Sequence, residues 1–444
     1  MSAPGLAAPP VTASPAPLVV NNEEPLSTPV YKSTDMNFGA SDEYGRTIKW
    51  RYRDLQEPAL SRELERMAAA TSYLDGRTEA VTFQPCCNEE ESSQDRYTVQ
   101  GWGFGDEKKK WRFVGLFDGH AGPEMADHAV SKLPPRMQAA LGSYLETHPL
   151  EKGIDTDAIT LSDLLALFNA SSPTPLPGPS PSARDPLAHA IAAATAELRP
   201  LSDAKIKSII NDPAKQPVVV RSMRGTTALV SLVDPDAQHV WVASVGDCQA
   251  ALGKRMDGGR WSVEILSANH NGNNPREEQR VRDAHPGEPE CMLRNRVLGS
   301  IAVTRAIGDH LYRLPRVWTE RVFLECAEGF RTHTVVRDFI VRNMTPPYLS
   351  NVAEMRHAEL GRGESVLVMC SDGLTDLYYA DQNELQKTAK EWFSVLDRRK
   401  EENMGLRLLR EGLGGNDDGE VAQMMTVEMF ERWMDDTTVI VQRL

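Results

Sequence analysis

The chain lacks any long uninterrupted run of apolar residues, and its cysteines form no Cys-x-x-Cys pair. A membrane-spanning helix needs roughly 20 mainly apolar residues, so the sequence predicts no membrane span. The six cysteines include the neighbours Cys86 and Cys87, and the other four lie in or beside apolar segments. This pattern indicates reduced core thiols in a cytosol-type compartment rather than disulfides or zinc ligands.

Positive charge is also scarce, because 63 acidic residues against 49 Lys and Arg give a formal net charge of −14. This balance would repel a phosphate backbone, so we expect no nucleic-acid partner. Residues 1–30 contain no Lys or Arg, whereas secretory signals and mitochondrial transit peptides carry basic residues. The composition therefore predicts a cytoplasmic protein.

The order of segments indicates one large domain behind a low-complexity start. Residues 1–37 are rich in Ala, Pro and Ser and are predicted to be disordered. Residues 38–81 form an extension in which apolar residues recur at helical spacing over 52–67. Residues 82–444 are long enough for one catalytic core, interrupted near 171–184 by a Pro- and Ser-rich loop. We interpret this loop as a linker, with phosphorylation of its Ser-Pro and Thr-Pro dipeptides as the alternative.

The apolar patterns within the core predict both helices and strands. The segment 123–141 is typical of a helix with proline in its first turn. Short apolar runs at 227–233, 240–245 and 249–252 are separated by turn residues and predict an antiparallel meander. Together they indicate an α/β fold, a four-layer sandwich of two mainly antiparallel sheets flanked by helices.

Three aspartates stand at the ends of strongly apolar runs. Asp118 follows the run 113–117, Asp372 follows the run 365–370, and Asp435 precedes the run 437–441. Each alone is most simply a turn or cap residue, and Asp-Gly is a common turn between strands. Three together indicate one shared, charged site. Carboxylates without paired histidines or cysteines suit Mg²⁺ or Mn²⁺ rather than zinc.

Six blocks in order carry a resemblance to a known family: FVGLFDGHAG, RGTTALVSLV, HVWVASVGDCQAALG, LGSIAVTRAIGD, LVMCSDGLTD and DDTTVIV. They resemble the metal-dependent type 2C serine/threonine protein phosphatases. Within this family the chain is most similar to the pyruvate dehydrogenase phosphatase branch, through DGHAG, LSANHNGNNPREEQRV, AHPGE, TPPYL and GGNDDG. The resemblance implies the sandwich fold, a phosphoprotein substrate and two Mg²⁺ or Mn²⁺ ions. It also implies the mitochondrial matrix as the alternative location.

The resemblance implies a role for each matching residue. Asp118 would bridge the two ions and the Gly119 carbonyl would bind the second, while Asp372 and Asp435 would hold the first. His120 would be the general acid for the leaving oxygen, since its ordinary pKa suits proton donation near neutrality. The alternative is that His120 only orients Asp118.

The chain also departs from the family pattern at the second ion. Gln94-Asp95 stands where the family has a Glu-Asp pair, so a neutral amide replaces one charged ligand and weaker metal binding is expected. Glu91, reached through a shifted loop, is the alternative ligand.

Other departures concern phosphate and a third ion. The phosphate-holding arginine of many members has no counterpart in 88–93; Arg96 or Arg305 would be substitutes, or else structural ion-pair residues. Ser222 stands about where many members have an aspartate, which leaves Asp376 without its partner.

Three functions therefore compete. The leading hypothesis is an active Mg²⁺- or Mn²⁺-dependent protein phosphatase, expected to be a monomer. The second is a pseudophosphatase that keeps the fold as a protein-binding module. The third is a metal-dependent hydrolase of small phosphoesters, which would need a deep pocket.

Overall fold

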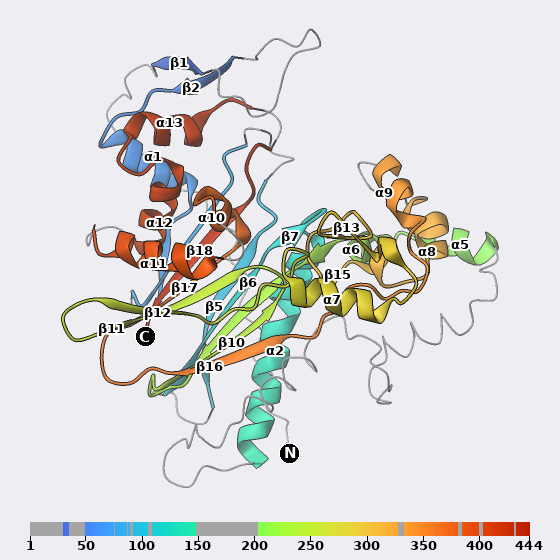
Figure 1. Cartoon of the computed structure of the whole chain (residues 1–444), viewed down its shortest axis with the longest axis horizontal. Coiled ribbons are helices and arrows are strands. Elements are labelled where there is room, and N and C mark those ends of the chain that lie inside the picture. Colours follow the sequence, from blue (N-terminus) through green and yellow to red (C-terminus); the bar gives the residue numbers. More distant parts are fainter. Residues whose placement is uncertain are drawn as a thin grey trace, which may run out of the picture.

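The computed structural model of the chain describes residues 30–34, 49–74, 76–86, 88, 92–104, 109–147, 203–326, 333–380, 384–398, 403–429 and 432–444. At its centre two antiparallel sheets are stacked (Figure 1). One has five strands in the order β16 (Glu354–Glu359), β10 (His239–Val245), β9 (Ala228–Val233), β6 (Lys110–Phe117) and β5 (Arg96–Gly103). The other has six, in the order β12 (Trp261–Ile265), β11 (Gln249–Arg255), β17 (Ser365–Cys370), β18 (Thr437–Arg443), β4 (Thr78–Phe83) and β3 (Thr71–Tyr73).

The two sheets face each other across an apolar layer, because side chains along a strand alternate between its faces. In β6, Val114 and Leu116 belong to this layer, whereas Phe113 belongs to the core on the outer face. The layer also contains a polar contact, since Gln442 of β18 donates from Nε2 to Ser231 Oγ of β9 at 2.8 Å. The buried hydrogen bond joins the sheets directly.

Helices cover both outer faces, and this confirms the predicted α/β sandwich (Figure 1). The six-stranded sheet packs against α1 (Ala59–Met67), α10 (Asp372–Leu377), α11 (Leu385–Leu396), α12 (Met404–Leu413) and α13 (Asp418–Thr426). The five-stranded sheet packs against α2 (Glu124–Thr147), whose Met125, Ala129 and Leu133 are buried on it.

A lobe with its own apolar core lies at one end of the sandwich, on the right-hand side of Figure 1. Its elements are α5 (Asp203–Ile210), α6 (Gln216–Met223), α7 (Pro275–Ala284), α8 (Arg316–Trp318), α9 (His333–Ile340), the hairpin β13 (Met292–Leu293) and β14 (Arg296–Val297), and the single turns η3 (Pro289–Cys291), η4 (His310–Tyr312) and η5 (Thr319–Phe323). A small sheet of β15 (Ile307–Gly308), β8 (Gly225–Thr226) and β7 (Gly119–His120) joins the lobe to the sandwich, because β7 follows β6 after one residue.

The predicted strands 227–233 and 240–245 are present as β9 and β10, which form an antiparallel hairpin. The predicted meander is wrong in its third strand, because β11 belongs to the other sheet. The chain crosses between the sheets at Gly246 and Asp247. Gly246 has a φ of 111°, and a Cβ there would lie 2.5 Å from the Thr227 side chain, so the crossing requires glycine.

The helix predicted over 52–67 begins only at Ala59. Residues 50–53 form β2, which pairs with β1 (Tyr31–Thr34), and Pro58 lies directly before the helix, a position where its missing N–H costs nothing. The helix predicted over 123–141 is α2. It continues to Thr147 through Pro134 and Pro135.

The predicted domain boundaries stay predictions. Residues 31–34 form a strand within the segment for which disorder is expected, and β4 begins at Thr78, ahead of the boundary expected at 82. The remainder of 1–37 and the loop near 171–184 lie outside the described residues.

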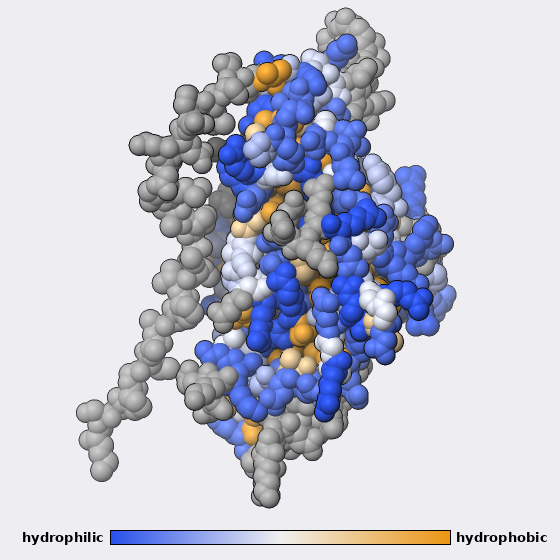
Figure 2. Space-filling model, turned by 90° about the vertical axis from the view of Figure 1, so that its left-hand side faces the viewer, coloured by the Kyte–Doolittle hydropathy of each residue, from blue (hydrophilic) through white to orange (hydrophobic). Residues whose placement is uncertain are grey.

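Among the described residues, no helix combines the length and the apolar character that a membrane crossing requires. Figure 2 shows one face of the molecule on which hydrophilic side chains surround small apolar areas. The five described cysteines form no disulfide, and Cys248, Cys291, Cys326 and Cys370 are buried.

Candidate metal centre

Three carboxylates meet where strands of both sheets turn toward one another. Asp118 separates β6 from β7, Asp247 separates β10 from β11, and Asp372 begins α10 one residue after β17. One oxygen of each lies within 4.8 Å of an oxygen of both others. This spacing suits hard divalent cations, which bind through carboxylate oxygens.

The three carboxylates are electrostatically unfavourable without a cation. Burial raises the pKa of Asp118 well above its ordinary value, and Asp372 is its strongest charged neighbour. Burial and the charge of Asp247 act in the same way on the pKa of Asp372. Asp247 is 6% exposed, and burial raises its pKa to about 6 although Asn271 Nδ2 lies 3.4 Å from its Oδ2. Negative charges buried so closely need a compensating cation, so the donor set fits a divalent metal.

A cavity of about 540 Å³ contains this cluster and most of the residues predicted for the site. Its polar lining residues include Gln94, Asp118, Gly119, His120, Asp247, Asp309, Asp372, Asp376, Arg432 and Asp435.

Asp95 and Asp435 lie beside the group of three rather than within it. Asp95 is 5% exposed, and burial together with the charge of Asp436 raises its pKa to about 7. Asp435 lines the cavity, and its Oδ1 accepts a hydrogen bond from the Asp436 N–H at 2.8 Å. Burial raises its pKa too. Both remain predicted ligands at the edge of the cluster.

Gln94 occupies the cavity wall next to Asp118 and Gly119. Its Oε1 accepts a hydrogen bond from the Gly122 N–H at 2.8 Å, and its own N–H donates to Asp436 Oδ2 at 2.8 Å. A Cβ on Gly119 would lie 2.5 Å from the Gln94 carbonyl oxygen, so the two backbones are in close contact. Its metal role stays a prediction. The alternative ligand Glu91 lies outside the described residues.

His120 is oriented by a carboxylate that the sequence analysis had not assigned. Its Nε2 lies 2.8 Å from Oδ2 of Asp309, a residue that is 2% exposed. Burial lowers the pKa of His120, but the charge and hydrogen bond of Asp309 outweigh it, so the pKa is raised. Gly225 lies opposite His120 in the small sheet, and a Cβ there would come within 2.1 Å of both partners. The pair therefore depends on glycine at that position.

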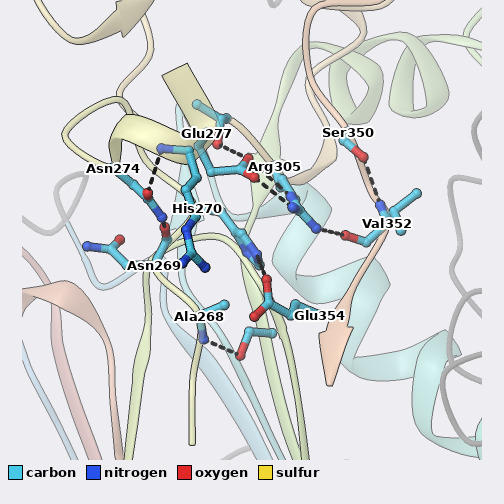
Figure 3. Close-up of polar contacts among 12 residues, drawn as sticks. Ala268, Asn269, His270, Asn274, Glu277, Arg305, Ser350, Val352 and Glu354 are labelled. Atoms are coloured by element: carbon cyan, nitrogen blue, oxygen red, sulfur yellow. Dashed lines mark hydrogen bonds and ion pairs between the residues drawn. The ribbon is translucent and has the colours of Figure 1, made fainter. Parts of the chain in front are cut away.

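The segment that follows β12 is fastened to the sandwich by the polar contacts of Figure 3. Arg305 forms an ion pair of 2.6 Å with Glu277 of α7 and donates to the Val352 carbonyl at 2.9 Å. His270, which is 1% exposed, lies 3.6 Å from Glu354 at the start of β16. These contacts fix the backbone next to Asn271, the neighbour of Asp247.

The structure places the other residues considered for phosphate or a third ion. Arg96 pairs with Asp127 at 2.6 Å and Arg305 with Glu277, which supports the structural ion-pair interpretation of both. Ser222 donates to the Val218 carbonyl at 2.7 Å within α6.

Arg432 is a cation on the cavity wall that sequence reasoning missed. It forms an ion pair with Asp436, and its charge partly opposes the rise in the pKa of Asp435 that burial causes. Asp247 and Asp309 were missed as well. Asp118 and Asp372 were singled out because each precedes a glycine after an apolar strand, whereas Asp247 and Asp309 each follow a glycine. The same pattern with the two residues in either order would have included all four.

Comparisons with known proteins agree with this geometry. The family model of protein phosphatase 2C matches residues 188–397. A protein phosphatase 2C homolog of Schizosaccharomyces pombe is 25% identical over 82% of this chain and 78% of its own length. The mitochondrial pyruvate dehydrogenase phosphatase 1 of Saccharomyces cerevisiae is 28% identical over 67% of this chain, and human phosphatase 2 is 31% identical over 49%.

The chain spans about half the length of these two pyruvate dehydrogenase phosphatases, 46% and 47%. A serine-threonine phosphatase 2C structure from Toxoplasma gondii aligns with 84% of this chain and 96% of its own, at 15% identity and a TM-score of 0.48.

The two-sheet sandwich and the carboxylate cluster at the ends of its strands define the class as an α/β protein with a site suited to divalent cations. The family model and the curated relatives make the similarity specific: the chain is similar to the protein phosphatase 2C family, over residues 188–397 for the family model and over 82% of its length for the Schizosaccharomyces pombe homolog.

Proposed function

We propose that the chain hydrolyses phosphoserine and phosphothreonine in proteins by means of water activated at a site for two Mg²⁺ or Mn²⁺ ions. The observation that carries the proposal is the group Asp118, Asp247 and Asp372, with oxygens within 4.8 Å of one another. Asp435, Gln94, Asp95 and the Gly119 carbonyl are the further ligands we propose.

Divalent cations bound there would lower the pKa of coordinated water and so provide a nucleophile near neutral pH. The fold holds the carboxylates in place, because Asp118 and Asp372 lie in turns that β6 and β17 fix. Asp247 is fixed by the crossing between the sheets. Substrate phosphate entering the cavity would meet Arg432 on its wall.

His120 is the general acid in this proposal. The Asp309 carboxylate stabilises the protonated imidazole through Nε2 and keeps a proton available for the leaving serine or threonine oxygen. Because Nε2 is engaged by Asp309, we propose Nδ1 as the nitrogen that donates.

Pyruvate dehydrogenase is the substrate that we propose at the finer level. The support is the similarity to proteins named pyruvate dehydrogenase phosphatase, at 28% and 31% identity. A direct test is release of phosphate from the phosphorylated E1 subunit. The cytoplasmic location and the monomeric state stay predictions, and a fluorescent tag at the C-terminus checks the first.

A pseudophosphatase is the second candidate, and Gln94 in the cavity wall is the observation that favours it. The hydrolase of small phosphoesters is less favoured, because a second cavity adjoins the metal cavity and offers room for more than a small ligand.

Purified protein assayed on phosphothreonine peptides with Mn²⁺, with Mg²⁺ and in EDTA tests the proposal. We expect turnover with either cation and loss of it in EDTA, and Asp118→Asn should lower turnover by orders of magnitude. The matched control is Asp257→Asn, in the exposed turn at the far end of β11 from Asp247. A folded protein that binds phosphopeptide without hydrolysing it, at any metal concentration, would establish the pseudophosphatase instead.

A further inference from the structure

A second cavity, of about 880 Å³, adjoins the metal cavity. The two cavities share the lining residues Asp376, Arg432 and Asp435. The second lies between α10, α11, α12 and α13 and the segment that precedes β18. We call it the lateral groove and define it by Asp376, Tyr379, Glu391, Glu411, Glu420 and Trp433. A molecule bound along this groove therefore lies next to the metal cavity at one end.

The charges of the lateral groove are predominantly negative. Glu391 and Glu420 are exposed on α11 and α13. Glu411 pairs with Arg398 at 2.9 Å. The Arg432 charge is balanced by its ion pair with Asp436, so it does not neutralise the remaining acids. A polypeptide that carries Lys or Arg would complement these carboxylates.

An exposed aromatic ring stands at the same place. Tyr379 is 92% exposed and has a φ of 49°, a backbone conformation that aromatic residues rarely adopt. Its N–H donates to the Asp376 carbonyl at 2.9 Å and closes the end of α10. Glycine or Asn is usual at such a position, and the tyrosine here places an exposed aromatic ring beside the groove. Aromatic rings attract Lys and Arg side chains through their π-face.

We infer that the lateral groove holds the polypeptide segment next to the phosphorylated residue and favours substrates with Lys or Arg in that segment. The inference rests on the proposed function, because the phosphorylated residue occupies the metal cavity. Three observations support it: the groove joins the metal cavity, its charge is opposite to that of a basic segment, and Tyr379 is exposed within it.

The test compares two phosphopeptides and one small substrate. The peptides share one phosphothreonine, flanked by lysines in one and by serines in the other, and p-nitrophenyl phosphate serves as a substrate too small to reach the groove. For the wild type we expect a kcat/KM about fivefold higher with the lysine peptide than with the serine peptide at low salt. The preference should disappear at high salt, since exposed charges are screened.

The variant Glu391→Gln/Glu420→Gln should bring the two peptides to within about twofold of each other. The matched control Asp257→Asn/Glu264→Gln removes the same charge from exposed positions outside the groove and should keep the wild-type preference. Tyr379→Ala should lower kcat/KM for the lysine peptide relative to p-nitrophenyl phosphate.

Equal kcat/KM for the two peptides in the wild type, or an unchanged preference in Glu391→Gln/Glu420→Gln, would overturn the inference while p-nitrophenyl phosphate is still hydrolysed. Absence of metal-dependent hydrolysis of every substrate would instead reject the proposed function. The two failures are thus distinguishable.

Discussion

Replacement of Asp247 by asparagine tests the carboxylate cluster most directly, because it removes one charge and almost no volume. Burial raises the pKa of Asp247 from 3.8 to about 6. Between these pH values the folded chain binds more protons than the unfolded chain, so the free energy of unfolding of the metal-free protein falls as pH rises. At about 1.4 kcal/mol for each pH unit, ionised Asp247 destabilises the metal-free fold by roughly 3 kcal/mol at pH 7.

We expect Asp247→Asn to remove about half of this destabilisation, roughly 1.5 kcal/mol, because the protons that the cluster binds are shared among Asp247, Asp118 and Asp372. Thermal unfolding at pH 7 in EDTA should therefore shift upward by about 3 °C. Below pH 4 wild type and variant should be equally stable.

Saturating Mn²⁺ should make the wild type more stable than Asp247→Asn. A cation at 100 times its dissociation constant stabilises the wild type by about 2.7 kcal/mol, and the variant should gain much less. Asp257→Asn is the control, expected to follow the wild type throughout. If Asp247→Asn is less stable than wild type in EDTA and gains as much from Mn²⁺, Asp247 does not belong to a repulsive metal centre.

Three further predictions concern residues around the centre. Gln94→Glu keeps an acceptor for the Gly122 N–H and adds a charge, so the half-saturating Mn²⁺ concentration should fall by about tenfold; an unchanged titration would remove Gln94 from the second metal position. Asp309→Asn withdraws the charge that raises the pKa of His120, so the pH above which kcat declines should move down, and an unshifted profile would exclude His120 as the acid. Glu277 lies buried against Arg305, whose charge, together with Arg280 and Thr304, overcomes burial and lowers the pKa of Glu277 to about 2. The stability that ionised Glu277 contributes is thus present above its ordinary pKa of 4.5 and is lost as the pH falls from 4.5 toward 2. Glu277→Gln should flatten that loss in acid unfolding and cost about 3–5 kcal/mol at pH 7, since it leaves Arg305 buried without its charge partner; an unaltered acid limb would contradict the pairing.

The sequence predicted the local elements and the class of site, because both follow from short-range patterns. Short apolar runs identified β6, β9, β10 and β17, and the position of Asp118 and Asp372 after such runs predicted a shared charged site. The positions of these two aspartates depend only on where a strand ends.

What the sequence did not predict depends on which sheet a strand joins. Closely spaced strands are usually paired, so 240–245 and 249–252 were expected to be neighbours joined by turn residues. The chain instead crosses to the other sheet at Gly246, where a side chain would collide with Thr227, and this crossing brings Asp247 to the centre. Asp309 was missed for a similar reason, since its contact with His120 joins residues 189 positions apart.

The pairing of β4 with β18 has a consequence for biogenesis. The two strands lie side by side in the six-stranded sheet, and the Thr438 and Thr82 hydroxyls that connect them are 356 positions apart. During synthesis, β4 leaves the ribosome long before its partner exists, and contacts of such separation form slowly. β4 can pair with β3 at once, but its other edge has no partner through most of the translation, and we expect the nascent chain to need a chaperone until β18 is inserted between β4 and β17.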